Sequence, residues 1–197
     1  MTTPDASVDG ASSADSGAEV LYARAVLADR PVAYYRFEED SVANAARDEI
    51  SGEWAPSQGG GVSFGAAGIV GRGLRVAGRD GLKVGDRFDF AGKVSFAVEL
   101  WVKTSARGRD QHLLHKRQEG AATMQGWLVY LADDATAHFE AWGVDMTAWT
   151  VQPIPAGFTH VVASVSYSGG LGNAHLWIDG QVSPKGGWDA LDALADT

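Results

Sequence analysis

The chain has 197 residues, and 45% of them are hydrophobic, which is enough apolar side chain for one domain of ordinary to large size. Its net charge of −9, with no basic run longer than Lys116-Arg117, argues against nucleic acids and anionic membranes as partners. Cysteine is absent, which excludes disulfides and thiolate zinc sites, and no apolar run is long enough to span a membrane.

The N-terminal segment, residues 1–18, is rich in Ala, Ser, Asp and Gly and lacks the basic start of a signal peptide. Such a composition buries too little apolar surface to offset the entropy of ordering. We therefore predict a disordered spacer, followed by one domain over residues 19–197.

The next segments carry weaker signals. Residues 19–28 have apolar side chains at roughly helical spacing and predict a short helix that ends before Pro31. Residues 32–37 predict a first strand, and the acidic, irregular residues 38–55 predict a long surface loop.

Residues 94–103 form the longest clean alternation in the chain. Phe96, Val98 and Leu100 share one face of this predicted strand, whereas Glu99 and Trp101 share the other. The first face needs a second layer to cover it, so we expect these apolar side chains to lie between two sheets.

Many other short segments have strand character. Residues 158–167 alternate in the same way and place Val161, Ala163 and Val165 on one face, while Asp133-Asp134 and Asp179-Gly180 predict hairpin turns. The remaining candidate strands are residues 62–64, 73–76, 82–84, 112–116, 126–132, 136–142, 147–151, 174–178 and 181–182. About eleven short strands without a long helix predict an all-β, two-sheet antiparallel sandwich.

Several of these segments, in this order, resemble the bacterial laminin G-like domains of the concanavalin A-like lectin/glucanase superfamily. The segments that carry the resemblance are residues 22–37, 46–52, 71–76, 95–102, 158–161 and 176–180. The resemblance implies a two-sheet jelly roll that binds glycans or protein surfaces, usually in secreted or cell-surface proteins and often with calcium.

Asp48 is a candidate for a calcium site, because the family that this chain resembles has an Asp-Ser-Ser-Gly-type loop there, but this chain carries one extra residue in it. Asp48 and Ser51 are the candidate metal ligands, together with loop carbonyls, and residues 38–40 add three carboxylates nearby. The alternative is a solvated acidic loop.

The sequence holds no convincing catalytic motif. Ser63 lies in a Gly-x-Ser-x-Gly pattern, but a glycine run precedes it and no helical period follows, so a strand entering a turn is the better interpretation. Glu49 and Glu53 are not in the strand motif of paired acids that the related glucanases carry, and Glu99 is followed by Trp101. We therefore expect a protein that is not an enzyme.

The histidines predict no metal site. His112 and His115 are three residues apart, so a regular strand would place them on opposite faces. His138, His160 and His175 each stand alone in a strand and are expected to be half-buried.

The seven tryptophans divide into two groups. Those inside predicted strands are expected in the core: Trp101, Trp127, Trp142 and Trp177. Those in loops or in a short exposed strand are candidates for stacking on sugar rings: Trp54, Trp149 and Trp188.

These observations favour a non-catalytic extracellular or cell-surface module, of a bacterial exported protein, that binds a glycan or a protein surface. The alternatives are a glycoside hydrolase or lyase of the same superfamily and a structural spacer domain of a larger surface protein. The family's last strand is expected to be missing, which would leave residues 32–37 as an open edge for a strand from a partner chain.

Overall fold

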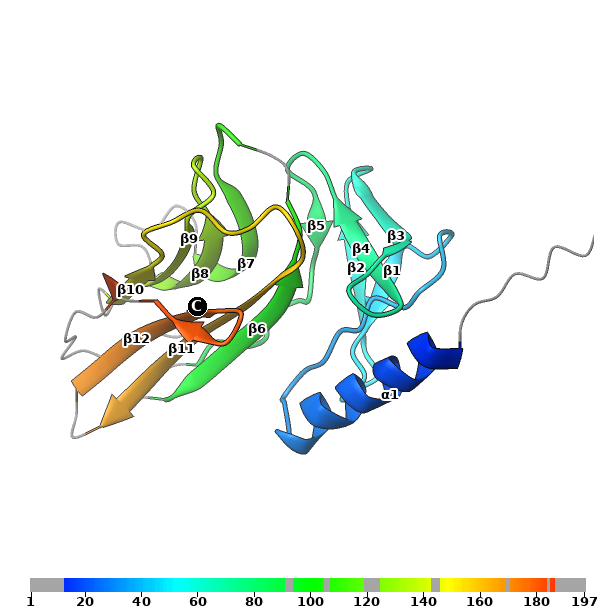
Figure 1. The fold of residues 1–197 in the computed structure, drawn as a ribbon, viewed down its shortest axis with the longest axis horizontal. Coiled ribbons are helices and arrows are strands. Elements are labelled where there is room, and N and C mark those ends of the chain that lie inside the picture. The colour runs from blue at the N-terminus through cyan, green and yellow to red at the C-terminus, as the bar shows by residue number, and fades with distance from the viewer. Residues whose placement is uncertain are drawn as a thin grey trace, which may run out of the picture. The chain divides into compact units, whose positions relative to one another are not determined.

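The computed structural model describes residues 13–90, 94–104, 107–118, 125–142, 146–168, 171–183 and 185–186 (Figure 1). The chain forms two compact units, Met1–Gly85 and Asp86–Thr197. The single domain predicted for residues 19–197 stays a prediction.

The first unit begins with helix α1, Ser13–Ala28, which reaches into the segment predicted as a spacer. Residues 1–12 lie outside the described part of the chain. The helix ends before Pro31, as predicted, because the Arg30 N–H donates to the Leu27 carbonyl and Arg30 has a left-handed φ of 54°. Within the described residues, no helix is long and apolar enough to cross a membrane.

The strand predicted at residues 32–37 is wrong. Only one isolated bridge forms there, between Tyr35 and Asp48. The Asp48 loop binds the backbone of Tyr34 on both sides, since Asp48 Oδ1 accepts its N–H and the Glu49 N–H donates to its carbonyl. Phe37 then adopts a left-handed φ of 60°, which ends the extended backbone. The open edge expected at these residues is therefore not formed.

The rest of the first unit is built from short strands. Strands β1 (Ala45–Arg47), β2 (Trp54–Gln58) and β5 (Gly81–Leu82) form a three-stranded sheet, and β3 (Val62–Ala67) pairs with β4 (Arg72–Val76). The loop predicted for residues 38–55 is thus interrupted by β1 and the start of β2. Buried Ala46 pairs with buried Ala55 there, but a three-residue strand is too short to show a period of two.

The second unit is a sandwich of two antiparallel sheets that face each other (Figure 1). The four-stranded sheet has the order β13-β12-β11-β6, and the five-stranded sheet has the order β14-β10-β9-β8-β7. The strands are β6 (Phe96–Val102), β7 (Gln111–Gln118), β8 (Gln125–Leu131), β9 (Ala137–Trp142), β10 (Met146–Trp149), β11 (Thr159–Ser168), β12 (Leu171–Ile178), β13 (Gln181–Val182) and β14 (Lys185–Gly186). The all-β class and the two-sheet antiparallel sandwich are confirmed.

The core of the sandwich follows the predicted register. Strand β6 pairs with β11 so that Phe96 lies opposite Val165, Val98 opposite Ala163 and Leu100 opposite Val161. Phe96 and the three β11 side chains are buried, and Val98 and Leu100 pack against the core while half-buried. Glu99 and Trp101 alternate with these residues and point to the other face, as predicted.

The predicted hairpins are also present. Strands β8 and β9 pair around the Asp133-Asp134 turn, and β12 pairs with β13 around Asp179 and Gly180, whose φ values of 49° and 78° fit a type I′ turn. Strand β14 adds Lys185–Gly186 to the edge of β10, where the sequence predicted no strand. Residues 187–197 lie outside the described part.

Gly126 should be intolerant of a side chain. Its φ is 104°, and a Cβ atom there would lie 2.1 Å from the Lys116 carbonyl oxygen on the neighbouring strand. We expect Gly126→Ala to lower the free energy of unfolding by about 2–4 kcal/mol, measured by urea denaturation. The matched control is Gly157→Ala, because a Cβ atom there meets nothing within 4 Å. Equal stability of the two variants would contradict this reading of the β7–β8 pair.

Candidate functional site

The five-stranded sheet presents an aromatic row on its outward side. On β8 and β9 the side chains that point inward are buried in the core, so the alternate residues point outward. The strand register places four of these outward residues side by side across four strands. In order across the sheet they are Trp149 of β10, His138 of β9, Tyr130 of β8 and His112 of β7.

Ring contacts hold this row together. The rings of Tyr130 and His138 stack with centroids 4.9 Å apart and planes 24° apart. His112 meets Tyr130 edge to face, with centroids 6.2 Å apart. His112 is exposed and the other three side chains of the row are half-buried, so a ligand can reach their rings.

Two further rows complete what we call the outer face. The second row consists of Thr147, Glu140, Leu128 and His115, and the third consists of Trp142, Gly126 and Arg117. The Arg117 guanidinium lies 5.8 Å from the centroid of the Trp142 ring, which is a cation–π contact. The outer face therefore combines aromatic rings with hydrogen-bonding groups.

Tyr130 and Glu140 form the main polar contact of the outer face. The Tyr130 hydroxyl donates a hydrogen bond of 2.8 Å to Glu140 Oε1. Burial, followed by this hydrogen bond and the negative charge of Glu140, raises the pKa of the Tyr130 phenol above its ordinary value. The neutral phenol thus orients the carboxylate, which keeps its second oxygen for another donor.

A second contact fixes the ring of His138. The Thr136 hydroxyl donates its one proton to Asp134 Oδ1 at 2.7 Å. The Thr136 hydroxyl oxygen also lies 2.9 Å from His138 Nε2. Because the Thr136 proton is already used, Nε2 of His138 donates to Thr136 Oγ1, which fixes the orientation of the ring. Hydrogen bonds from the hydroxyl and N–H of Thr136 also lower the pKa of the Asp134 carboxyl.

The prediction that His112 and His115 lie on opposite faces is wrong. A β-bulge between His112 and Leu114 inserts one residue into β7, so His112 pairs with Tyr130 and His115 pairs with Leu128, both of which point outward. The two imidazole rings meet on the outer face with centroids 5.9 Å apart. The sequence gives no signal for this bulge.

The structure divides the tryptophans differently from the sequence argument. Trp149 belongs to the aromatic row, whereas Trp54 is 59% exposed in β2 of the first unit, and Trp188 lies outside the described residues. Trp127 is in the core, as predicted. The core placement is wrong for Trp101, Trp142 and Trp177, which are half-buried on outward strand positions. A period of two identifies alternating positions but not which of them face the other sheet.

Asp48 and Ser51 come together as predicted, but as a hydrogen-bonded loop. The Asp48 carboxylate is fully buried and accepts hydrogen bonds from the N–H groups of Tyr34 and Ile50 and from the Ser51 hydroxyl, the last at 2.6 Å. Its backbone N–H donates to the Glu53 carbonyl. The loop is thus closed around one carboxylate.

This arrangement is a poor fit for calcium, which takes about six to eight oxygen ligands. Three of the roughly four lone-pair positions of the Asp48 carboxylate are already occupied by N–H and O–H donors. Ser51 is itself one of those donors. Among the described residues no group of three His, Asp or Glu side chains could hold a metal ion. Calcium binding stays a prediction.

The candidate catalytic residues Ser63 and Glu49 lie in a strand pair and in a surface ion pair. Ser63 pairs with Arg75 inside β3, and that strand continues to Ala67 instead of turning into a helix. Glu49 lies 3.5 Å from the Arg47 guanidinium in an ion pair at the surface of the Asp48 loop. Among the described residues, these contacts bring no second catalytic group to Ser63 or Glu49.

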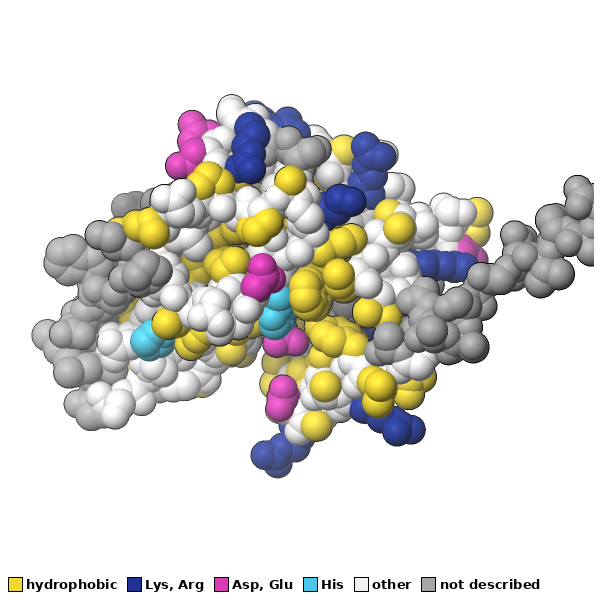
Figure 2. Space-filling view, in the orientation of Figure 1, with side chains coloured by type: hydrophobic (Ala, Val, Ile, Leu, Met, Phe, Trp, Pro, Cys, Tyr) yellow, Lys and Arg dark blue, Asp and Glu magenta, His cyan; other side chains and the backbone are white. Residues whose placement is uncertain are grey.

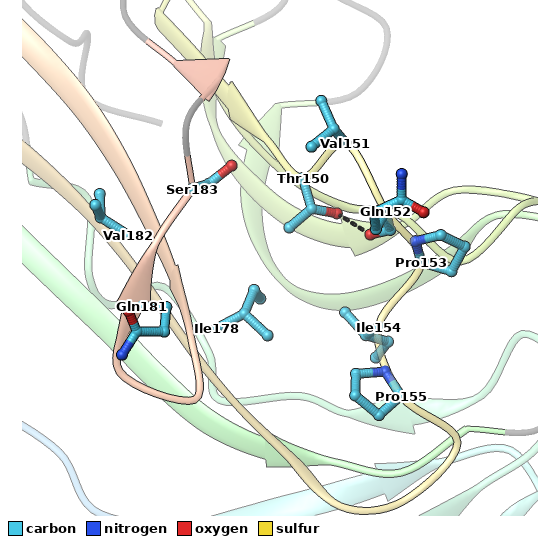
Figure 3. A pocket seen from close by; sticks show the side chains of 10 residues that line it. All are labelled: Thr150, Val151, Gln152, Pro153, Ile154, Pro155, Ile178, Gln181, Val182 and Ser183. Carbon is cyan, nitrogen blue, oxygen red and sulfur yellow. Dashed lines mark hydrogen bonds between the residues drawn. The ribbon is translucent and has the colours of Figure 1, made fainter.

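A separate hollow of about 220 Å³ lies between the 150–155 segment and the β12–β13 hairpin. Figure 3 shows Ile154 and Ile178 facing each other across it, while the Thr150 hydroxyl donates to the Gln152 carbonyl at 2.8 Å. Its walls are aliphatic and proline side chains with a few amides and hydroxyls, and they include no titratable group. The outer face is chemically the richer site.

The comparisons with known proteins agree with this architecture. A family model, Laminin_G_3, described as the concanavalin A-like lectin/glucanases superfamily, matches residues 76–187, which are more than half of the chain. No curated protein and no solved structure matches the chain. The matched span contains strands β6 to β13 and therefore the whole outer face.

Asp48→Ala should destabilise the first unit because it leaves the N–H groups of Tyr34 and Ile50 and the Ser51 hydroxyl without their acceptor. We expect a loss of about 2–4 kcal/mol in the free energy of unfolding, measured by urea denaturation. Ser51→Ala removes one of the three hydrogen bonds and should cost only about 1 kcal/mol. A smaller loss for Asp48→Ala than for Ser51→Ala would contradict the role of this carboxylate.

The Tyr130 phenol should ionise above the ordinary tyrosine value of about 10, because burial and Glu140 favour its neutral form. The folded state then holds the proton more tightly, so this contribution to stability is complete below about pH 10 and is lost as the pH rises further. The measurement is the ultraviolet absorbance of phenolate in wild type minus that in Tyr130→Phe. Glu140→Gln should bring the pKa back down, and ordinary titration of Tyr130 in the wild type would refute the assignment.

Proposed function

Because the chain belongs to the concanavalin A-like lectin/glucanases superfamily, whose domains often bind carbohydrate, we propose that its outer face is a non-catalytic binding surface for a glycan. The observation that carries the proposal is the aromatic row from Trp149 through His138 and Tyr130 to His112. The row offers ring faces across four neighbouring strands of a rigid sheet.

The chemistry of the outer face suits a sugar. Aromatic rings stack on the apolar C–H faces of pyranose rings, and the Trp142 and Trp149 indoles and the Tyr130 phenol supply such rings. Hydroxyl groups of a sugar need partners that both donate and accept, which Glu140 and the histidines provide. Figure 2 shows basic and acidic side chains scattered among neutral atoms on the surface in view, a pattern unlike the basic patch that nucleic acids require. A protein surface is the alternative ligand.

A binding role is supported over the hydrolase or lyase alternative by the acids on this face. Glycoside hydrolysis uses two carboxyl groups about 5–9.5 Å apart. Among the described residues of the outer face, Glu140 is the one carboxylate, and it accepts a hydrogen bond from Tyr130. We therefore propose a lectin-like module that works outside the cell or at its surface, where glycans are accessible.

A glycan-array screen of the purified chain tests this function. We expect a hit for wild type and an affinity at least about tenfold lower for Trp149→Ala, equivalent to roughly 1.4 kcal/mol, because one stacking platform is removed. The matched control is Trp177→Ala, which removes an equally half-buried indole from the outward side of the other sheet.

The screen is run both with calcium and with a chelator. A hit that needs calcium but is kept by Asp48→Ala would place the metal away from Asp48. Loss of binding in Trp177→Ala with full binding in Trp149→Ala would move the site to the four-stranded sheet. A protein that binds no glycan in either condition would favour a structural spacer or a protein ligand.

A further inference from the structure

We infer that His112 and His115 form a two-histidine site for a divalent transition-metal ion such as Cu²⁺, Ni²⁺ or Zn²⁺. Both side chains are exposed on the outer face, and their ring centroids lie 5.9 Å apart with ring planes at 72°. The site exists because the β-bulge in β7 changes which face His112 occupies. The inference does not rest on the proposed function, although His112 also ends the aromatic row.

The separation of the rings suits a shared metal ion. A metal that sits about 2.0–2.1 Å from one nitrogen of each imidazole holds the two ring centroids about 5–6 Å apart, for bond angles from tetrahedral to nearly linear. Because a metal lies in the plane of each imidazole that binds it, planes that are steeply inclined to each other are compatible with one ion.

The backbone holds the two histidines in place before a metal arrives. Strand β7 is paired with β8 on both sides of the bulge, from Gln111 opposite Leu131 to Lys116 opposite Trp127. Such preorganisation reduces the conformational entropy lost on binding. Imidazole nitrogen is a preferred ligand of Cu²⁺, Ni²⁺ and Zn²⁺, and the chain has no thiol to compete for them.

Charges of both signs lie near the pair, since Arg117 is the next outward residue after His115 on β7. Asp110 is close enough for its negative charge to act on Tyr130, whose ring meets His112. The described residues contain no group of three His, Asp or Glu that could hold a metal ion, so two protein ligands leave the other coordination positions to water or to an external donor. The geometry therefore points to an exchangeable site with open positions at the β7 end of the aromatic row.

The test is a calorimetric titration of the full chain, without a polyhistidine tag, with Cu²⁺ and then with Ni²⁺ and Zn²⁺. We expect one specific site, and an affinity at least about tenfold lower in either His112→Ala or His115→Ala. His175→Ala is the matched control, because it removes a half-buried histidine beside Trp177 on the other sheet. Equal affinity in all four proteins would overturn the proposal.

Spectroscopy on the same samples keeps the result independent of folding defects. Electron paramagnetic resonance of the Cu²⁺ complex should show coupling to two imidazole nitrogens in wild type and to one in each single variant. Copper should also broaden the ring proton signals of His112 and His115 in the NMR spectrum before those of His138, His160 and His175. Coupling to a single nitrogen in wild type, or earlier broadening at another histidine, would refute a shared site.

Discussion

The alternation of inward and outward side chains along β8 and β9 is the constraint on which the rest of the second unit depends. Val129 of β8 and Phe139 of β9 are paired neighbours in one sheet. Both side chains point into the core between the sheets and are completely buried. Because successive side chains on a strand point to opposite faces, burying these residues forces Tyr130, His138 and Glu140 outward. A shift of the register by one residue would place polar groups in the core and lose the outer face together with the apolar packing.

The bulge in β7 shows how a local irregularity changes chemistry without disturbing the core. On one side of it Gln111 still pairs with Leu131, and on the other side Lys116 pairs with Trp127. Only the facing of His112 relative to His115 differs from that of a regular strand. The backbone accommodates the extra residue locally, and Leu113 still packs against the core.

The sequence predicts the elements whose pattern is long enough to measure. Strands β6 and β11 have seven and ten residues, and their alternation identified the buried faces correctly. The Asp179-Gly180 turn was also identifiable, because few residues adopt left-handed φ values at two successive positions. The resemblance to the concanavalin A-like superfamily, which relied on the order of several weak motifs, is confirmed by the family model.

The elements that the sequence missed depend on contacts between distant residues. The extended residues 32–37 look like a strand, but the backbone of Tyr34 is bound by Asp48, which lies fourteen positions further along the chain. Likewise, nothing near Trp149 in the sequence indicates that its neighbours in space are His138 and Tyr130, because that row exists only once three strand registers are set.

The outer face contains positions whose side chains can vary and at least one position that cannot carry a side chain. His112, Tyr130, Glu140 and Trp149 contribute side chains on the outward side, so their replacement changes the chemistry of this surface while the inward residues keep the sandwich together. Gly126 is different, because its backbone conformation and the nearby Lys116 carbonyl leave no room for any side chain. It sits between Arg117 and Trp142 in the third row, so the absence of a side chain there lets the Arg117 guanidinium approach the Trp142 ring. The backbone geometry that the β7–β8 pair requires thus also shapes the surface on which a ligand would lie.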